Sequence, residues 1–294
     1  MDPVHGLVLG IVQGLTEFLP ISSSGHLVLV PWLLGWPPHG LTFDVALHLG
    51  TLAALVAYFW RDLWRLAAAW LPRRDLAFGP IKGTEVVQTS TGRVIRAVES
   101  EARQRDRRLG LSLVAGSVPA AVVGALFADQ IEASLRAPAT IAALLIVAGG
   151  LLAAADRAGI QKLGLESIGI PLGVLIGLAQ ALSLAPGVSR SGITLAAGLF
   201  FGLTREAAAR YAFLLGVPVT AGAAVFQLRH LVRGGIPADQ RGAFALGIAA
   251  SLVVGMLAIH GLLRYVRGRS LDVFVGYRIA VGLLVLVVAA LGIR

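Results

Sequence analysis

The sequence predicts an all-α polytopic membrane protein with six transmembrane helices plus two re-entrant helical hairpins, arranged as an inverted-topology repeat. Three observations lead to this fold class. Hydrophobic residues make up 56% of the 294 residues and charged residues only 14%, with a mean hydropathy of +0.80. Six apolar stretches are long enough to cross a bilayer. Two further apolar regions are interrupted near their middle, and the two interruptions resemble each other.

The composition excludes several classes of protein. A soluble domain typically carries about 25% charged residues, and a disordered chain is rich in charge and poor in apolar residues. The chain has no cysteine, which excludes disulfides, thiolate metal sites and cysteine nucleophiles. Its net charge of +9 is typical of basic cytoplasmic loops in a membrane protein. We therefore expect the membrane bilayer as a partner and no nucleic acid.

A transmembrane helix needs about 20 apolar residues, with about 17 as a minimum. Stretches of this kind, rich in Ala, Leu, Val and Gly, are predicted to cross the membrane at 43–60, 110–128, 138–155, 205–228, 243–264 and 273–293. We expect a single integral-membrane domain over 1–294, with repeat 1 over about 1–155 and repeat 2 over about 169–294. Within the loop 61–108, the stretch 72–106 is expected to be loosely ordered, because it is polar, carries both charge signs and lacks apolar periodicity.

The two interrupted regions, 3–36 and 169–203, contain residues that end helices. The first break, at 18–26, contains Pro20, and the second, at 185–192, contains Pro186 and a glycine. A serine then follows in each, and serine is a favoured residue before the start of a helix. Each half is too short to cross alone, and non-helical backbone survives at membrane depth only where protein or water surrounds it. These regions are therefore predicted to be re-entrant hairpins.

The interrupted regions repeat at an offset of 167 residues. The stretch GIVQGLT at 10–16 corresponds to GLAQALS at 177–183, and SSSG at 22–25 corresponds to SRSG at 189–192. Interrupted helices in matching positions of two halves are typical of repeat architectures with a site near the membrane midplane.

Loop charges predict the orientation. Sixteen Lys and Arg residues lie in the loops 61–108, 157–162 and 264–269, and four lie in the loops on the other side. The excess marks the cytoplasmic side. The first hairpin then enters from the outside and the second from the inside.

Polar residues in the first break predict a site. Glu17 ends an apolar half-helix four residues after Gln13, so the two share a helix face. A carboxylate at membrane depth is costly and is functional by default. Ser22 and Ser23 follow, and either could cap the next helix or act as a nucleophile, with His26 or Glu17 as its base. A helix N-terminus with hydroxyls and an imidazole is also an anion site.

Arg190, in the second break, predicts the other half of the site. Its planar guanidinium suits bidentate contact with phosphate, and Glu17 offers a place for a divalent cation. If the two breaks meet, they form a site for a polyanion, most simply a diphosphate. The alternative is that Arg190 only forms a salt bridge with Glu17. For Asp44 and His48, which lie one turn apart, a supporting and an interfacial role stay equally open, and Arg278 is expected to pair with a carboxylate or bind an anionic headgroup.

Two motifs carry a resemblance to a known family. The first reads QGLTEFLPISSSGH at 13–26, and the second reads PGVSRSGIT at 186–194. Together with FLLGVP at 213–218 and the pair Tyr277 and Arg278, they resemble the undecaprenyl-diphosphate phosphatase family of the bacitracin-resistance type. The resemblance covers essentially the whole chain, least so the loop 61–108.

The resemblance implies an activity. The family hydrolyses undecaprenyl diphosphate to undecaprenyl phosphate and inorganic phosphate, which recycles the lipid carrier for peptidoglycan synthesis. It uses Mg²⁺ or Ca²⁺ and faces the outer side of the bacterial plasma membrane.

The resemblance also implies site residues. Gln13 stands where many members have glutamate, which weakens the case for a metal site on two carboxylates. Carried over by position, the candidate residues are Glu17, Ser23, His26 and Arg190 for catalysis, Ser22, Ser24, Gly25, Gly187, Ser189, Ser191 and Thr194 for substrate binding, and Glu17 and Gln13 for the metal.

Two other functions stay open at this stage. A transporter or flippase also uses broken helices in inverted repeats, but it has no need of the Glu17, Ser23, His26 and Arg190 set. Lipid phosphatases of the acid-phosphatase type need a histidine soon after the arginine, and none follows Arg190 until His230. The sequence leaves both a monomer and a homodimer open.

Overall fold

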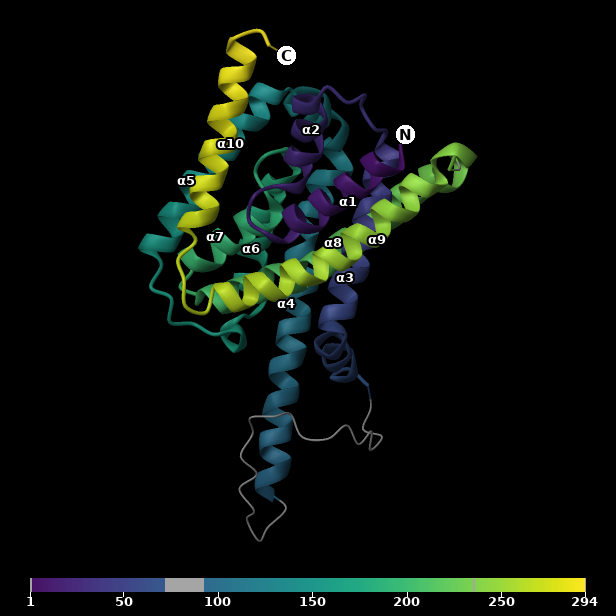
Figure 1. Cartoon of the computed structure of the whole chain (residues 1–294). Coiled ribbons are helices and arrows are strands. Elements are labelled where there is room, and N and C mark those ends of the chain that lie inside the picture. Colours follow the sequence, from purple (N-terminus) through teal and green to yellow (C-terminus); the bar gives the residue numbers. More distant parts are fainter. Residues whose placement is uncertain (1, 72–92, 235, 294) are drawn as a thin grey trace.

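The computed structural model describes residues 2–71, 93–234 and 236–293, and its long elements are all helices (Figure 1). In chain order they are α1 (Pro3–Phe18), α2 (Ser23–Leu34), α3 (Leu41–Ala68), α4 (Arg93–Leu135), α5 (Pro138–Ala158), α6 (Ile170–Ala181), α7 (Arg190–Phe200), α8 (Arg205–Gly234), α9 (Arg241–Tyr265) and α10 (Asp272–Ala290). Short 3-10 turns lie at Leu165–Ser167, Leu182–Leu184 and Ala238–Gln240.

Within the described residues, six helices are long and apolar enough to cross a membrane, as predicted. They are α3, the Glu101–Ala128 part of α4, α5, the Arg205–Val225 part of α8, α9 and α10. This all-helical fold is that of a polytopic membrane protein. The shorter apolar helices α1, α2, α6 and α7 are the halves of the two interrupted regions.

The prediction of a loosely ordered stretch over 72–106 is wrong over its last part, and the loop predicted over 61–108 is helical at both ends. Helix α3 continues to Ala68 and α4 begins at Arg93, so 61–68 and 93–108 are helical, while 72–92 lie outside the described residues. Polar contacts explain the difference: the guanidiniums of Arg103 and Arg107 donate to the Ala69 carbonyl at 2.9 and 2.7 Å. Arginines of α4 thereby satisfy a carbonyl left free at the end of α3, which apolar periodicity does not reveal.

The two breaks lie where the sequence predicts them and have the same local geometry. Ser22 precedes α2 with φ 78° and Ser189 precedes α7 with φ 75°. Each hydroxyl accepts a hydrogen bond from the glycine amide three residues on, at 3.4 Å in the first break and 3.1 Å in the second. Left-handed backbone is uncommon outside glycine, so both serines hold a conformation that the surrounding contacts must maintain.

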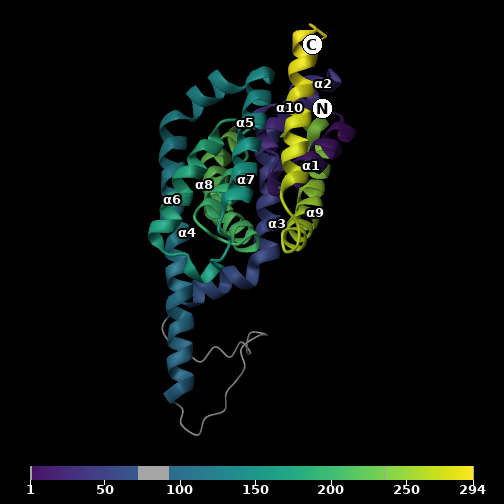
Figure 2. The same ribbon diagram turned by 90° about the vertical axis from the view of Figure 1, so that its left-hand side faces the viewer.

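The first half-helix of each interrupted region packs closely on a long helix of the opposite half of the chain. Helix α1 lies against α9, and α6 lies against α4 (Figures 1 and 2). Gly6 and Gly10 face the backbone of α9, and Gly173 and Gly177, which lie 167 residues later, face the backbone of α4. A methyl group at any of the four would overlap a backbone carbonyl oxygen of the partner helix. Small residues that let helices approach in this way are typical of membrane helix packing.

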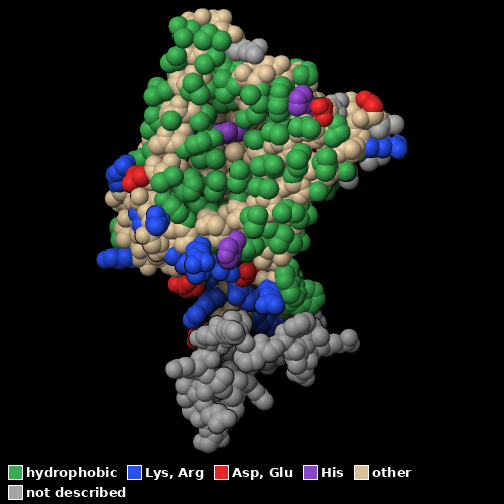
Figure 3. All heavy atoms as spheres, in the orientation of Figure 1, with side chains coloured by type: hydrophobic (Ala, Val, Ile, Leu, Met, Phe, Trp, Pro, Cys, Tyr) green, Lys and Arg blue, Asp and Glu red, His purple; other side chains and the backbone are tan. Residues whose placement is uncertain are grey.

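The surface separates apolar from basic side chains. In Figure 3 hydrophobic side chains cover most of the visible face of the helical body, and Lys and Arg gather at its lower end. Exposed tryptophans of and just after α3, at 60, 64 and 70, lie in the stretch that carries Arg61 and Arg65. Aromatic and basic residues of this kind are enriched where a membrane protein leaves the hydrocarbon core.

Candidate functional site

The carboxylate of Glu17 lies at the centre of the predicted site. Helix α1 places Gln13 and Glu17 one turn apart, and both are buried. The Gln13 side-chain amide donates to Glu17 Oε2 at 3.0 Å, which confirms the shared helix face. Gln13 Oε1 is buried and has no partner among the described residues. An amide oxygen left free beside a carboxylate is a suitable ligand for a hard divalent cation.

The structure separates the roles of the first two serines. Ser22 Oγ caps α2 and also accepts the Gly187 amide of the other break at 3.1 Å. Ser23, the first residue of α2, donates its hydroxyl to Glu17 Oε2 at 2.5 Å. Ser24 has only a 3.5 Å contact between its hydroxyl and that of Ser22. Of the two candidate nucleophiles, Ser23 is the one whose hydroxyl faces a base.

Arg190 reaches the same carboxylate from the second break. Its Nη2 donates to Glu17 Oε1 at 2.6 Å. Its Nη1 is buried, has no partner among the described residues, and lies against Gly216 of α8. The salt bridge that was the alternative interpretation is thus present, but it uses only part of the guanidinium. Nη1 is thus left without an acceptor among the described residues.

The other hydroxyls of the second motif are bound to backbone. Ser189 caps α7, Ser191 donates to the Leu19 carbonyl at 3.1 Å, and Thr194 donates to the Arg190 carbonyl at 2.6 Å. Gly187 has φ 102°, in the region that favours glycine. Ser191 thus links the two breaks, whereas Ser189 and Thr194 form their hydrogen bonds within α7 and its cap.

His26 is buried, and both of its ring nitrogens are occupied. Nδ1 lies 2.7 Å from the Ser22 carbonyl and Nε2 lies 2.8 Å from the Tyr277 hydroxyl. A carbonyl only accepts, so Nδ1 carries the hydrogen and Nε2 accepts from Tyr277. The base facing Ser23 is therefore Glu17, and no contact joins His26 to the serine hydroxyls.

His48 and Arg278 join the neighbourhood of the site in ways the sequence did not settle. His48 Nε2 lies 3.7 Å from Glu17 Oε2, and its Nδ1 contacts the Asp44 carbonyl, so His48 belongs to the surroundings of the site. The Asp44 carboxylate turns away from the site and contacts His39 at 2.6 Å.

The prediction that Arg278 pairs with a carboxylate or an anionic headgroup is wrong. Its guanidinium donates to four backbone carbonyls. Sequence patterns did not reveal these partners, because they are backbone atoms of distant segments.

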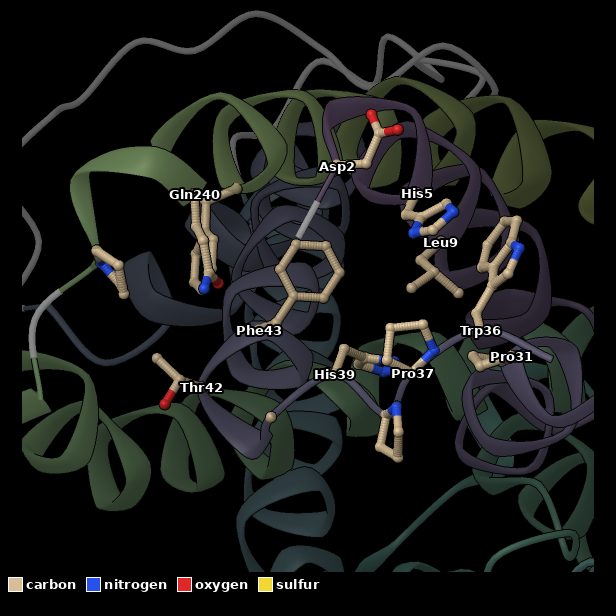
Figure 4. A pocket seen from close by; sticks show the side chains of 14 residues that line it. Asp2, His5, Leu9, Pro31, Trp36, Pro37, His39, Thr42, Phe43 and Gln240 are labelled. Carbon is tan, nitrogen blue, oxygen red and sulfur yellow. The ribbon is translucent and has the colours of Figure 1, made fainter. Parts of the chain in front are cut away.

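A separate cavity of about 630 Å³ lies at the ends of α1, α3 and α9. Figure 4 shows it between Asp2 and His5 on one side and Phe43 and His39 on another. Half of its 14 lining residues are proline, tryptophan or phenylalanine, and none of the predicted site residues lines it. No group of three or more His, Cys, Asp or Glu side chains suited to a metal occurs in the described part of the chain. A cation at Glu17 therefore needs oxygens from outside these residue types.

Comparison with known proteins assigns the chain to a family. The pattern of the family described as bacitracin resistance protein BacA matches residues 6–284. An undecaprenyl-diphosphatase from Geotalea daltonii is 48% identical over 288 residues, which cover 98% of each chain. Proteins of the same name from Geobacter metallireducens and Thermomicrobium roseum are 47% and 45% identical, with 96% and 99% of each chain covered. The chain belongs to the bacitracin resistance protein BacA family.

Proposed function

We propose that this chain is an undecaprenyl-diphosphatase whose reaction takes place at Glu17, Ser23 and Arg190. It hydrolyses undecaprenyl diphosphate to undecaprenyl phosphate and inorganic phosphate, and so recycles the lipid carrier for peptidoglycan synthesis and supports bacitracin resistance. The observation that carries the proposal is the Ser23 hydroxyl 2.5 Å from a carboxylate that Arg190 also holds. Full-length relatives with this name support the substrate.

The arrangement suits phosphoryl transfer. Such reactions depend chiefly on alignment and charge neutralisation. Arg190, with an unpartnered Nη1, would bind a diphosphate oxygen, and the first amides of α2 and α7 would assist as helix N-termini. Glu17 Oε2 would accept the proton of the Ser23 hydroxyl as Oγ attacks the terminal phosphorus and undecaprenyl phosphate leaves. Water would then hydrolyse the phosphoserine. A direct attack by water held by Glu17 uses the same residues.

We propose Mg²⁺ or Ca²⁺ as the cofactor, held by Glu17 and Gln13. Both ions prefer oxygen ligands, and Mg²⁺ commonly binds through one or two carboxylates completed by substrate phosphates. The free Gln13 Oε1 beside Glu17 supports this assignment. When bound, the ion would neutralise charge on the diphosphate. The remaining candidates, His26, Ser22, Ser24, Gly25, Gly187, Ser189, Ser191 and Thr194, would position these groups or bind substrate oxygens.

We further propose that the two breaks are the tips of re-entrant hairpins in an inverted repeat. Helices α1–α5 would correspond to α6–α10. The matched caps at Ser22 and Ser189 support this. The helix contacts support it as well. Under this correspondence the packed pair α1 and α9 becomes the packed pair α6 and α4, and the packed pair α5 and α10 is exchanged with itself.

The same topology supports a location in the bacterial plasma membrane with the site open to the outer side. In this arrangement the basic end in Figure 3 is cytoplasmic. The undecaprenyl chain would stay in the bilayer while the diphosphate enters between the breaks.

An assay of the purified protein in detergent tests the function. Phosphate release from undecaprenyl diphosphate is expected to require a divalent cation and to stop in excess EDTA. Glu17→Gln should abolish it, because that carboxylate serves both Ser23 and Arg190. Ser167→Ala, an exposed hydroxyl in a 3-10 turn, is the matched control. Full activity of Glu17→Gln in chelator would overturn both the metal and the base.

A further inference from the structure

We propose that Arg278 is a positioning residue, which fixes the spacing between Glu17 and Arg190 by holding both broken turns with one guanidinium. The residue lies on α10, outside both motifs and without contact to either side chain. The inference rests on the proposed function for its catalytic consequence and on geometry alone for its structural part.

The contacts of Arg278 connect three segments. Its Nη1 donates to the Pro20 carbonyl at 3.0 Å, in the first break. Its Nη2 donates to the carbonyls of Gly187 at 2.8 Å and Val188 at 3.0 Å, in the second break. Its Nε donates to Leu145 of α5 at 3.1 Å. Four of the five guanidinium N–H groups are therefore used, and every partner is a backbone carbonyl.

The two breaks are tied together next to the reacting groups. Pro20 lies three residues after Glu17, and Val188 lies two residues before Arg190. A shift of either turn would change the 2.6 Å contact between Glu17 and Arg190. The carbonyls in question lie outside helices, where buried backbone groups need a partner. A fully buried arginine is also costly without hydrogen-bond acceptors. The Arg278 guanidinium and these carbonyls therefore satisfy each other.

The fold leaves room for this guanidinium. Gly149 of α5 and Gly192 of α7 face Arg278, and a methyl group at Gly192 would lie 3.1 Å from its Nη1. The preceding residue, Tyr277, holds His26 through its hydroxyl. One turn of α10 thus reaches His26 and both breaks.

Arg278→Lys tests the proposal, because lysine keeps the charge but has no planar fork that could reach both turns. The chain lacks cysteine, so spin labels can be attached at Leu15→Cys and Leu182→Cys, two exposed positions beside the breaks. In the otherwise unchanged chain the distance distribution between the labels should be narrow. In Arg278→Lys it should broaden, with at least a tenfold loss of kcat/KM. The exposed Arg267→Lys is the matched control and should change neither.

A double-mutant cycle separates positioning from general destabilisation. In an Arg190→Lys background, Arg278→Lys should lower kcat/KM less than threefold. Arg190→Lys has already removed the guanidinium whose spacing from Glu17 Arg278 maintains. Equal losses in both backgrounds would overturn the proposal, as would a narrow distance distribution with activity within twofold of normal. Gly192→Ala places a methyl group against Nη1 of Arg278 and should also broaden the distance distribution between the labels. This variant provides the test if Arg278→Lys fails to fold. The distances need no activity, so failure of the phosphatase assignment would leave this measurement informative.

Discussion

The two oxygens of Glu17 serve different partners. Oε1 is bound by Arg190, whereas Oε2 receives the Ser23 hydroxyl and the Gln13 amide and faces His48. A buried carboxylate needs such compensation, because leaving it unpaired would cost several kcal/mol. In this arrangement Oε2 faces the Ser23 hydroxyl, while the Arg190 guanidinium stays on Oε1. In the proposed reaction, this one carboxylate would serve both proton transfer and substrate alignment.

Arg190→Lys should distinguish an anion clamp from a structural salt bridge. Lysine can keep the ion pair with Glu17 but loses the fork, including the unpartnered Nη1. Loss of one charge-assisted hydrogen bond of about 1.5–3 kcal/mol corresponds to a fall in kcat/KM of about 10- to 150-fold. The measurement is steady-state phosphate release, with thermal unfolding in detergent to show that the protein is folded.

If the pair with Glu17 is only structural, a different result follows. Arg190→Lys would then have near-normal kcat, and Arg190→Gln would be unstable because it leaves Glu17 without its partner. The double variant Glu17→Gln/Arg190→Gln would regain stability, since no buried charge would remain. That set of results would contradict the clamp.

At the scale of the elements, the breaks were predictable and their internal geometry was not. Proline, glycine and serine mark where α1 and α6 end, and the boundaries at Phe18 and Ser23 agree with that prediction. The choice between Ser22 and Ser23 depends on backbone conformation: φ 78° turns Ser22 into a cap and leaves Ser23 to face Glu17. Likewise, the polar first part of α4 contacts the end of α3 through Arg103 and Arg107, and no apolar periodicity records these contacts.

The caps give a prediction in which glycine is the better substitute. At Ser22, alanine loses the cap and must also adopt a left-handed conformation that costs about 1–2 kcal/mol, whereas glycine loses only the hydrogen bonds. Ser22→Ala should therefore unfold at a lower temperature than Ser22→Gly, and Ser189 should show the same order. Ser24 lies inside α2 without positive φ, so there the order should reverse. Greater stability of Ser22→Ala than of Ser22→Gly would contradict the strained cap.

For the molecule as a whole, run lengths and composition predict the six crossing helices, because the bilayer constrains length more strongly than any contact does. The site was predictable only in part. Glu17, Ser23 and Arg190 carry unusual cost at membrane depth, and they do lie together. Arg278 carries the same cost, but its partners include the carbonyls of Gly187 and Val188, which lie 91 and 90 residues away in sequence. Backbone acceptors have no residue signature, so only the folded chain identifies them.

Two exposed glycines on opposite sides of the proposed topology report the orientation of the whole molecule. Gly40, between α2 and α3, and Gly268, between α9 and α10, are exposed, and a side chain at either would meet no atom within 4 Å. In the proposed topology Gly40 is outside and Gly268 is in the cytoplasm, where the basic loops lie. In intact cells a membrane-impermeant maleimide should label Gly40→Cys, and it should label Gly268→Cys only after permeabilisation. Ser24→Cys reports the site itself and should react from the outside. Labelling of Ser24→Cys only from the cytoplasmic side would place the diphosphatase site on the inner face, and the direction of lipid carrier recycling would have to be reversed.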